Sequence, residues 1–147
     1  NINGQFYCTR RAVPLIKAAG GGSIVNISSV AGRFGYPLRT PYAASKWAVI
    51  GFTKSLAMEL GPHDVCVNAL LPGFINNERT RAIFMAKAEA TGVTTDELER
   101  EILSRVSLQQ YVTSEDIAEM AVFLCSDVGR HISGQAISVC GNAESMC

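Results

Sequence analysis

The fold of this chain is decided by the stretch Gly22-Ser23-Ile24-Val25-Asn26-Ile27-Ser28-Ser29. Its centre is a short β-branched run between glycines and a loop rich in Gly and Pro, a pattern typical of a buried parallel strand. Two more runs of this kind occupy residues 65–71, which end at Pro72-Gly73, and residues 135–139. The sequence therefore predicts three short parallel strands.

Helical patterns separate the three strands. Apolar residues recur at helical spacing from residue 5 to about residue 19, where Gly20-Gly21-Gly22 ends the helix. The next helix is expected to reach about Leu60, with Thr40 as its N-cap and Pro41 in its first position. This alternation predicts an α/β fold, a doubly wound parallel sheet with helices on both faces. Such sheets normally have about six strands, so three strands with their flanking helices correspond to the C-terminal half of one domain.

The sequence from residue 76 to residue 112 is charged and helical in pattern. Thr94 and Glu97 predict a capping box for a helix that runs through Val106. Residues 113–126 predict a further amphipathic helix, because Glu115 and Asp116 suit the positive end of a helix dipole.

The bulk composition excludes several classes of protein. Thirteen Lys and Arg balance thirteen Asp and Glu, and no basic stripe for nucleic acid is present. No run of about 18 apolar residues predicts a membrane span. The five cysteines have no CxxC spacing, so we expect no disulfide framework, no metal site and a reducing, cytoplasmic compartment. The chain opens at Asn1 without Met, and we expect the N-terminal dinucleotide-phosphate half of its domain to be absent from it.

Tyr42 and Lys46 carry the first chemical signal. They are four residues apart on a predicted helix, so both side chains project from nearly the same face. A phenol with a pKa of about 10 is a poor base near neutral pH. An ammonium about 5 Å away favours the phenolate by roughly 3 kcal/mol at an effective dielectric constant of about 20. Taken alone, the pair is better interpreted as a surface lysine beside a half-buried tyrosine.

Ser28 and Ser29 strengthen the chemical interpretation. Both follow a predicted parallel strand, at the edge where open α/β sheets bind their ligands. The loop after them leads back to the helix of Tyr42, so a serine hydroxyl and the Tyr–Lys pair can converge on one carbonyl oxygen. The alternative for Ser29 is a turn residue that satisfies local backbone groups.

Several motifs together resemble one known family. Four segments of this sequence resemble the signature of the short-chain dehydrogenase/reductase family in order and spacing. They are the stretch from Gly22 to Ser29, Tyr42-Ala43-Ala44-Ser45-Lys46, Val67-Asn68-Ala69 and Pro72-Gly73. The family's Asn-x-x-Gly helix start resembles Asn1-Ile2-Asn3-Gly4, and its approach to the last strand resembles Ile132-Ser133-Gly134-Gln135. The resemblance covers residues 1 to about 141. It implies the C-terminal half of a Rossmann-like catalytic domain in which residues 76–112 form a helical substrate flap.

The resemblance also implies a catalytic tetrad. Ser29 would hold the substrate oxygen, and Tyr42 would be the general acid in reduction and the base in oxidation. Lys46 would assist the phenol and bind the nicotinamide ribose. Asn1 would seat a water that relays protons towards Lys46, with a helix cap as its alternative role.

A nicotinamide cofactor is implied by the same resemblance. Its site would comprise Tyr42, Lys46, Pro72, Gly73, Phe74, Ile75 and Asn77, where Asn77 stands at a position at which the family often has Thr. The glycine-rich phosphate loop and the residue that selects NAD or NADP are absent from this sequence, so the cofactor is NAD or NADP.

The expected activity is the interconversion of a secondary alcohol and a ketone, in the manner of 3-oxoacyl reductases or of sugar, polyol or hydroxysteroid dehydrogenases. Two alternatives remain: a catalytically idle relative that binds a nucleotide or a partner, and a pure interaction fragment. The resemblance further suggests a homotetramer or homodimer that pairs the helices at residues 5–19 and 42–60. Arg39 is interpreted as a solvated loop charge or as the holder of an acidic substrate group.

Overall fold

The computed structural model describes residues 2–143, and residues 1 and 144–147 lie outside this description. Helices and strands alternate along the described chain. Three short 3-10 helices stand at Val30–Gly32, Gly61–His63 and Asp127–Gly129. The main elements are α1 (Ile2–Ala18), β1 (Gly22–Ile27), α2 (Thr40–Leu60), β2 (Val65–Pro72), α3 (Glu78–Thr91), α4 (Thr95–Ser104), α5 (Ser114–Cys125) and β3 (Ala136–Val139).

The three predicted strands form one parallel sheet in the order β1-β2-β3. Ile24 pairs with Val67 between β1 and β2, and Leu71 pairs with Ser138 between β2 and β3. All three strands begin or end within one residue of the predicted ranges. The short β-branched runs therefore predicted the sheet correctly.

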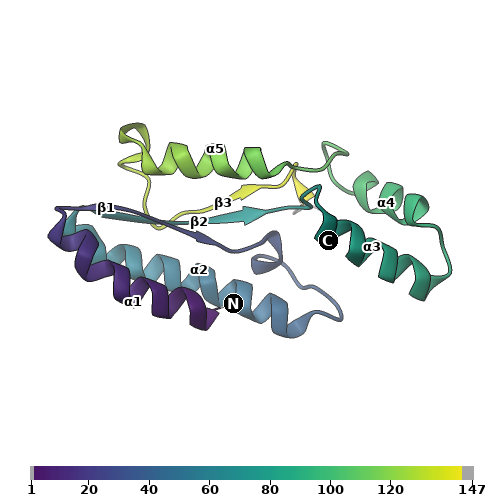
Figure 1. Ribbon diagram of the computed structural model, residues 1–147, viewed down its shortest axis with the longest axis horizontal. Coiled ribbons are helices and arrows are strands. Elements are labelled where there is room, and N and C mark those ends of the chain that lie inside the picture. The colour runs from purple at the N-terminus through teal and green to yellow at the C-terminus, as the bar shows by residue number, and fades with distance from the viewer. Residues whose placement is uncertain (1, 144–147) are drawn as a thin grey trace.

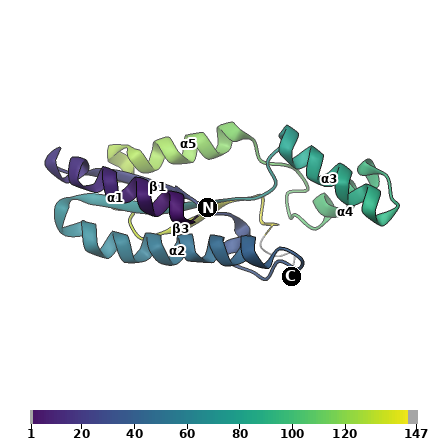
Figure 2. The same cartoon turned by 60° about the horizontal axis from the view of Figure 1, so that its bottom comes forward.

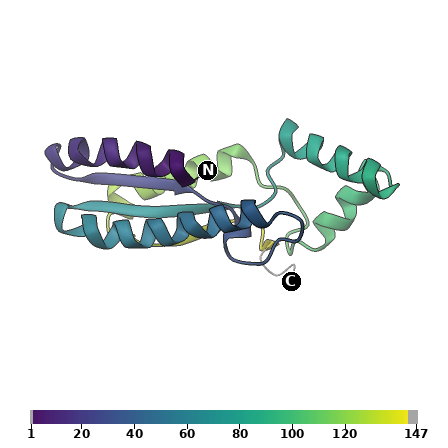
Figure 3. The same cartoon turned by 90° about the horizontal axis from the view of Figure 1, so that it is seen from below.

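The elements are arranged in three layers (Figure 1). Helices α1 and α2 lie side by side over one face of the sheet and α5 covers the other, as two further views confirm (Figures 2 and 3). Helices α3 and α4 stand apart from these layers, at the end where β2 leaves the sheet. The predicted doubly wound α/β architecture, with helices on both faces, is confirmed.

Helix α2 is fixed to the sheet by apolar packing and by one buried hydrogen bond. Leu56 and Leu60 pack against Val65 and Val67, and all four side chains are buried. Each fully buried side chain of this kind contributes roughly 1.5–3 kcal/mol. The amide of Asn26 on β1 also donates a hydrogen bond to the hydroxyl of Thr53, at 3.0 Å. This packing fixes the second half of α2 against the sheet.

The start of α2 differs from the prediction by one residue. Arg39, and not Thr40, is the N-cap, and its side chain makes no capping hydrogen bond. Pro41 therefore stands in the second helical position. Proline fits anywhere in the first turn because the N–H groups there have no intrahelical acceptor. Pro41 therefore marks the first turn of the helix without fixing which residue is the cap.

The structure confirms the two predicted helix starts that carry acidic residues in their first turn, those of α4 and α5. The hydroxyl of Thr94 accepts a hydrogen bond from the Glu97 N–H, and the Glu97 carboxylate accepts one from the Thr94 N–H, which completes the predicted capping box. Thr113 and Asp116 form a second capping box at α5. In both boxes the backbone hydrogen bond from the threonine lowers the pKa of the acid.

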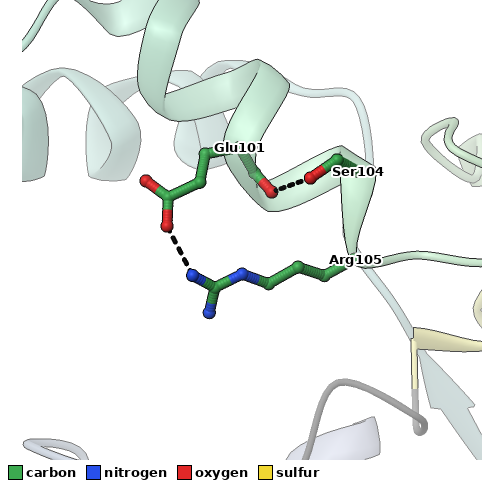
Figure 4. Close-up of polar contacts among 3 residues, drawn as sticks. All are labelled: Glu101, Ser104 and Arg105. Atoms are coloured by element: carbon green, nitrogen blue, oxygen red, sulfur yellow. Dashed lines mark hydrogen bonds and ion pairs between the residues drawn. The ribbon is translucent and has the colours of Figure 1, made fainter.

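Helices α3 and α4 form a hairpin with a small core of its own. Phe84 and Ala88 of α3 pack against Leu98 and Ile102 of α4. The outer side of α4 is polar: Glu101 pairs with Arg105, and Ser104 donates to the Glu101 carbonyl (Figure 4). A short parallel bridge between residues 75 and 112 closes the base of the hairpin. The expected flap at 76–112 is therefore a separate lobe that joins the sheet layers through two adjacent chain segments.

Candidate active site

A cavity of about 310 Å³ lies at the carboxyl end of the sheet, between the α2 start and the α3–α4 lobe. Residues from β1, the loop after it, α2, the end of β2 and α3 line it. It brings together every described residue that the sequence singled out as a site residue. These are Ser29, Tyr42, Lys46, Pro72, Gly73, Phe74, Ile75 and Asn77. Asn1, the remaining candidate, lies outside the described residues.

Tyr42 and Lys46 are placed on one face of α2, as their spacing predicts. The Lys46 Nζ lies 5.7 Å from the centroid of the Tyr42 ring and donates a hydrogen bond to the Ile27 carbonyl at 3.1 Å. Burial, and secondly the positive charge of Arg79, lower the pKa of Lys46. The ammonium is therefore held between the last residue of β1 and the phenol ring.

Ser28 and Ser29 have different environments. The Ser28 hydroxyl is buried and donates to the Lys46 carbonyl at 2.8 Å, which ties β1 to α2. The Ser29 hydroxyl oxygen caps the following 3-10 turn by accepting from the Ala31 N–H at 3.2 Å. The backbone role considered for Ser29 is thus correct for its oxygen. Its hydroxyl hydrogen has no acceptor within residues 2–143, so it can be donated into the cavity.

Two glycines allow the close approaches that shape the cavity. A Cβ on Gly32 would lie 2.9 Å from both the Lys46 carbonyl oxygen and the Ser28 hydroxyl. A Cβ on Gly73 would lie 2.8 Å from the Cα and Cβ of Cys140. Side chains do not tolerate such contacts, so glycine is required where the loop after β1 meets α2 and where the chain leaves β2 beside β3.

Asn77 and Phe74 line the cavity and also hold the α3–α4 lobe. The Asn77 side-chain carbonyl caps α3 by accepting from the Thr80 N–H at 2.9 Å, which leaves the amide N–H₂ as a donor. The Phe74 carbonyl accepts from the Val112 N–H at 3.0 Å, and its ring packs edge-on to Phe84. The segment after β2 thus connects the cavity floor to the lobe.

Arg39 stands at the tyrosine side of the cavity. Its guanidinium carbon lies 5.1 Å from the centroid of the Tyr42 ring and 5.8 Å from that of Tyr36. Two cations, Arg39 and Lys46, therefore lie within about 6 Å of the centre of the Tyr42 ring, at 5.1 and 5.7 Å. Cations over aromatic faces are attracted by the ring quadrupole.

The sequence comparison decides the family. The family model described as "Enoyl-(Acyl carrier protein) reductase" matches residues 1–141. The chain belongs to the short-chain dehydrogenase/reductase family. The 3-oxoacyl-[acyl-carrier-protein] reductase FabG of Staphylococcus aureus is 38% identical over 141 residues, which are 96% of this chain and 53% of that protein. FabG of Thermotoga maritima is 40% identical with the same coverage. The chain thus spans about half the length of the curated relatives it matches.

Solved short-chain dehydrogenase/reductase structures share the fold. An actinorhodin polyketide ketoreductase with NADPH superposes with a TM-score of 0.92 at 33% identity, over 98% of this chain and 56% of that chain. The sorbitol-6-phosphate 2-dehydrogenase SrlD of Erwinia amylovora gives 0.90 at 29% identity, over 95% and 56%. The resemblance seen in the motifs is therefore confirmed at the level of family and fold.

Two cavity features of this short-chain dehydrogenase/reductase chain were not predicted from its sequence. Arg79 of α3 lines the cavity, and Gln5 of α1 donates to the same Ile27 carbonyl that accepts from Lys46. Arg79 follows Asn77 by two residues, but only the fold of the lobe brings it near Lys46. Gln5 follows the site candidate Asn1 by four residues in the sequence, and that spacing was an available signal.

Metal binding and membrane crossing are two further classes of function to consider. Within residues 2–143, no three His, Cys, Asp or Glu side chains gather in a way that can hold a metal ion. None of the helices described there combines the length and the apolar character that a bilayer crossing requires.

Proposed function

We propose that the native protein containing this chain interconverts a secondary alcohol and a ketone with NAD(H) or NADP(H). The observation that carries this proposal is the convergence of Ser29, Tyr42 and Lys46 on one cavity at the carboxyl end of a parallel sheet. The similarity to 3-oxoacyl reductases and to a polyketide ketoreductase supports the same reaction class. A 3-oxoacyl ketone, or a sugar, polyol or hydroxysteroid alcohol, is the proposed range of substrates.

The proposed roles rest on the position of Tyr42 in the cavity lining and on the hydrogen bonds of Ser29 and Lys46. Tyr42 gives its phenolic proton to the substrate oxygen in reduction and takes it back in oxidation. Ser29 donates its hydroxyl hydrogen to the same oxygen, because its own oxygen already accepts from Ala31. The Lys46 ammonium lies beside the phenol ring and keeps further hydrogens beyond the one given to Ile27.

The cavity fits a nicotinamide cofactor, which supplies the hydride when bound. Lys46 has ammonium hydrogens for a ribose hydroxyl, and Asn77 has amide hydrogens for a carboxamide or a phosphate. Pro72, Gly73, Phe74 and Ile75 provide the adjoining wall. Asn1 is proposed to seat the relay water near Lys46.

We further propose that residues 1–147 are the C-terminal half of one catalytic domain. The coverage of the relatives supports this division, since about half of each is matched. A cytoplasmic homotetramer or homodimer that pairs α1 and α2 is the proposed assembly. Exposed apolar side chains on these helices support it, among them Phe6, Tyr7, Trp47 and Met58.

An idle relative that only binds nucleotide or partners remains the second candidate. The native protein is incubated with NADH or NADPH and a panel of acetoacetyl thioesters, ketoses and cyclic ketones, and the absorbance of the reduced nicotinamide is followed. The proposed function predicts turnover of at least one ketone. Cofactor binding without turnover of any ketone, and without oxidation of the matching alcohols, would favour the idle relative.

A further inference from the structure

The charge of the cavity differs from the charge of the whole chain. Acidic and basic residues balance over the sequence. The cavity lining, however, includes three cationic side chains, Arg39, Lys46 and Arg79, and no carboxylate among the residues described. Its walls include the rings of Phe34, Phe74 and Phe84. A hollow with one sign of charge and apolar walls concentrates its field and attracts ligands of the opposite sign.

Arg39 carries a charge that the described protein leaves unpaired. Within residues 2–143 no carboxylate forms an ion pair with its guanidinium, in contrast to Arg105, which is paired with Glu101 (Figure 4). Arg39 is half-buried and packs over the rings of Tyr36 and Tyr42. These ring contacts hold the guanidinium beside the phenol, and an arginine in such contacts can still donate its N–H groups to a ligand.

The two arginines belong to different walls. Arg79 follows the segment 72–77 that is proposed to line the cofactor, so its charge is available to the cofactor's phosphates. Arg39 lies on the loop between Ser29 and Tyr42, which carries the groups proposed to hold the substrate oxygen. The charge of Arg39 is therefore assigned to the substrate.

We propose that Arg39 binds an anionic group of the substrate, a carboxylate or a phosphate, close to the carbonyl that is reduced. This inference rests on the proposed function and names the substrate class of that site. Because the guanidinium carbon lies 5.1 Å from the Tyr42 ring centroid, the anion stands only a few atoms from the reacting oxygen. An oxo acid, a hydroxy acid or a phosphorylated ketone has this geometry. The planar fork of an arginine matches carboxylate and phosphate oxygens in a bidentate manner.

The test uses pairs of ketones that differ in charge. Reduction by the native protein is measured with acetoacetate and its methyl ester, and with dihydroxyacetone phosphate and dihydroxyacetone. We expect kcat/KM for one anionic member to exceed that of its neutral partner at least tenfold at low ionic strength, and this preference to shrink with added salt. A preference for acetoacetate over its methyl ester identifies the anion as a carboxylate. A preference for dihydroxyacetone phosphate over dihydroxyacetone identifies it as a phosphate.

Three variants connect the preference to Arg39. Arg39→Gln is expected to reduce the anionic-to-neutral ratio of kcat/KM by about 10- to 100-fold, the usual size of a charge-assisted contact. Arg39→Lys restores part of the ratio because it keeps the charge without the fork. Arg10→Gln removes an exposed arginine of α1 outside the cavity lining and should leave the ratio unchanged. The inference is overturned if Arg39→Gln lowers kcat/KM equally for the anionic and the neutral ketone of each pair, or if it weakens only cofactor binding.

Calorimetric titration of acetoacetate and of inorganic phosphate, with oxidised cofactor present, separates this inference from the proposed function. Anion binding that Arg39→Gln abolishes, in a protein that reduces no ketone, overturns the proposed function and supports the anion site. Reduction of neutral ketones by a protein that binds neither anion overturns the anion site and supports the proposed function.

Discussion

The Nζ of Lys46 donates a hydrogen bond to the backbone oxygen of Ile27, at 3.1 Å. The same oxygen accepts the Gln5 side-chain amide at 3.1 Å, so α1 and α2 both meet at the last residue of β1. The Gln5 carbonyl oxygen is buried and has no hydrogen-bond partner among the described residues. The lysine is thus positioned by the strand end and not by Tyr42 alone.

Lys46→Met should abolish most of the activity and preserve the fold. It removes the ammonium beside the phenol of the proposed proton donor and should lower kcat by roughly 10²-fold. Lys54→Met is the matched control, because Lys54 also lies on α2 and donates to a backbone carbonyl, that of Gly134. Steady-state kinetics compares the two, with circular dichroism to check folding. Equal losses in both variants would show that the effect of Lys46 is structural.

Arg79→Gln should move the high-pH limit of activity upward. Burial and the Arg79 charge both lower the pKa of Lys46, so both favour loss of the ammonium proton. Activity that needs the ammonium falls as the pH rises through this pKa. Removing the Arg79 charge raises the pKa of Lys46, and the fall then occurs at higher pH. The pH profile of kcat measures this change in the high-pH limit. A high-pH limit that does not move upward in Arg79→Gln would show that the Arg79 charge does not act on Lys46 in this way.

Ser29→Ala and Ser28→Ala should differ in their effect on kcat. Ser29→Ala removes a donor to the substrate oxygen and the cap of the 3-10 turn, and should lower kcat by about 10²-fold while costing about 1 kcal/mol in the free energy of unfolding. Ser28→Ala removes the buried hydrogen bond to the Lys46 carbonyl and should cost about 1 kcal/mol in the free energy of unfolding. Kinetics and urea denaturation of both variants decide this. If Ser28→Ala lowered kcat more than Ser29→Ala did and remained stably folded, Ser28 would be the donor to the substrate oxygen and Ser29 the structural residue.

Gly73→Ala should destabilise the floor of the cavity. Its Cβ would meet the Cys140 backbone and Cβ at 2.8 Å, and overpacking of this kind costs about 1–3 kcal/mol. Gly51→Ala on α2 is the control, because its Cβ would have nothing within 4 Å and alanine favours a helix by about 1 kcal/mol. Urea denaturation should therefore show opposite signs. An unchanged free energy of unfolding for Gly73→Ala would mean that the chain at Cys140, after β3, moves aside without an energetic penalty.

The sequence predicted the sheet and the cavity members well because both depend on local patterns. β-branched runs give the strands, and the four-residue spacing of Tyr42 and Lys46 gives their common face. The role of Gln5 depends instead on a contact 22 residues away, with Ile27. Likewise, Arg79 lines the cavity because α3 starts at the carboxyl end of the sheet, opposite the start of α2. Long-range packing of this kind leaves no period in the sequence.

Helix boundaries were predicted less well than helices. Helix α1 begins at Ile2, three residues before the start that the apolar period predicts, because the exposed Asn3 and Gly4 carry no apolar period. The resemblance to the Asn-x-x-Gly helix start predicted this position better. The Thr94 capping box was easier to locate, since it pairs a hydroxyl with an acid three residues on. The second box, of Thr113 and Asp116, has the same spacing but was not predicted. At Arg39 no side chain caps the helix, so no such pattern exists to be read.

Tyr42→Phe tests the central proposal most directly. The native protein and the variant are compared in ketone reduction, with cofactor affinity measured by nicotinamide fluorescence and with Tyr7→Phe, which alters an exposed tyrosine of α1, as control. Loss of the proton donor predicts a fall in kcat of about 10²- to 10⁴-fold, with cofactor affinity within a few fold of the parent and Tyr7→Phe fully active. A Tyr42→Phe variant that turns over as fast as its parent would contradict the proposed role of this phenol.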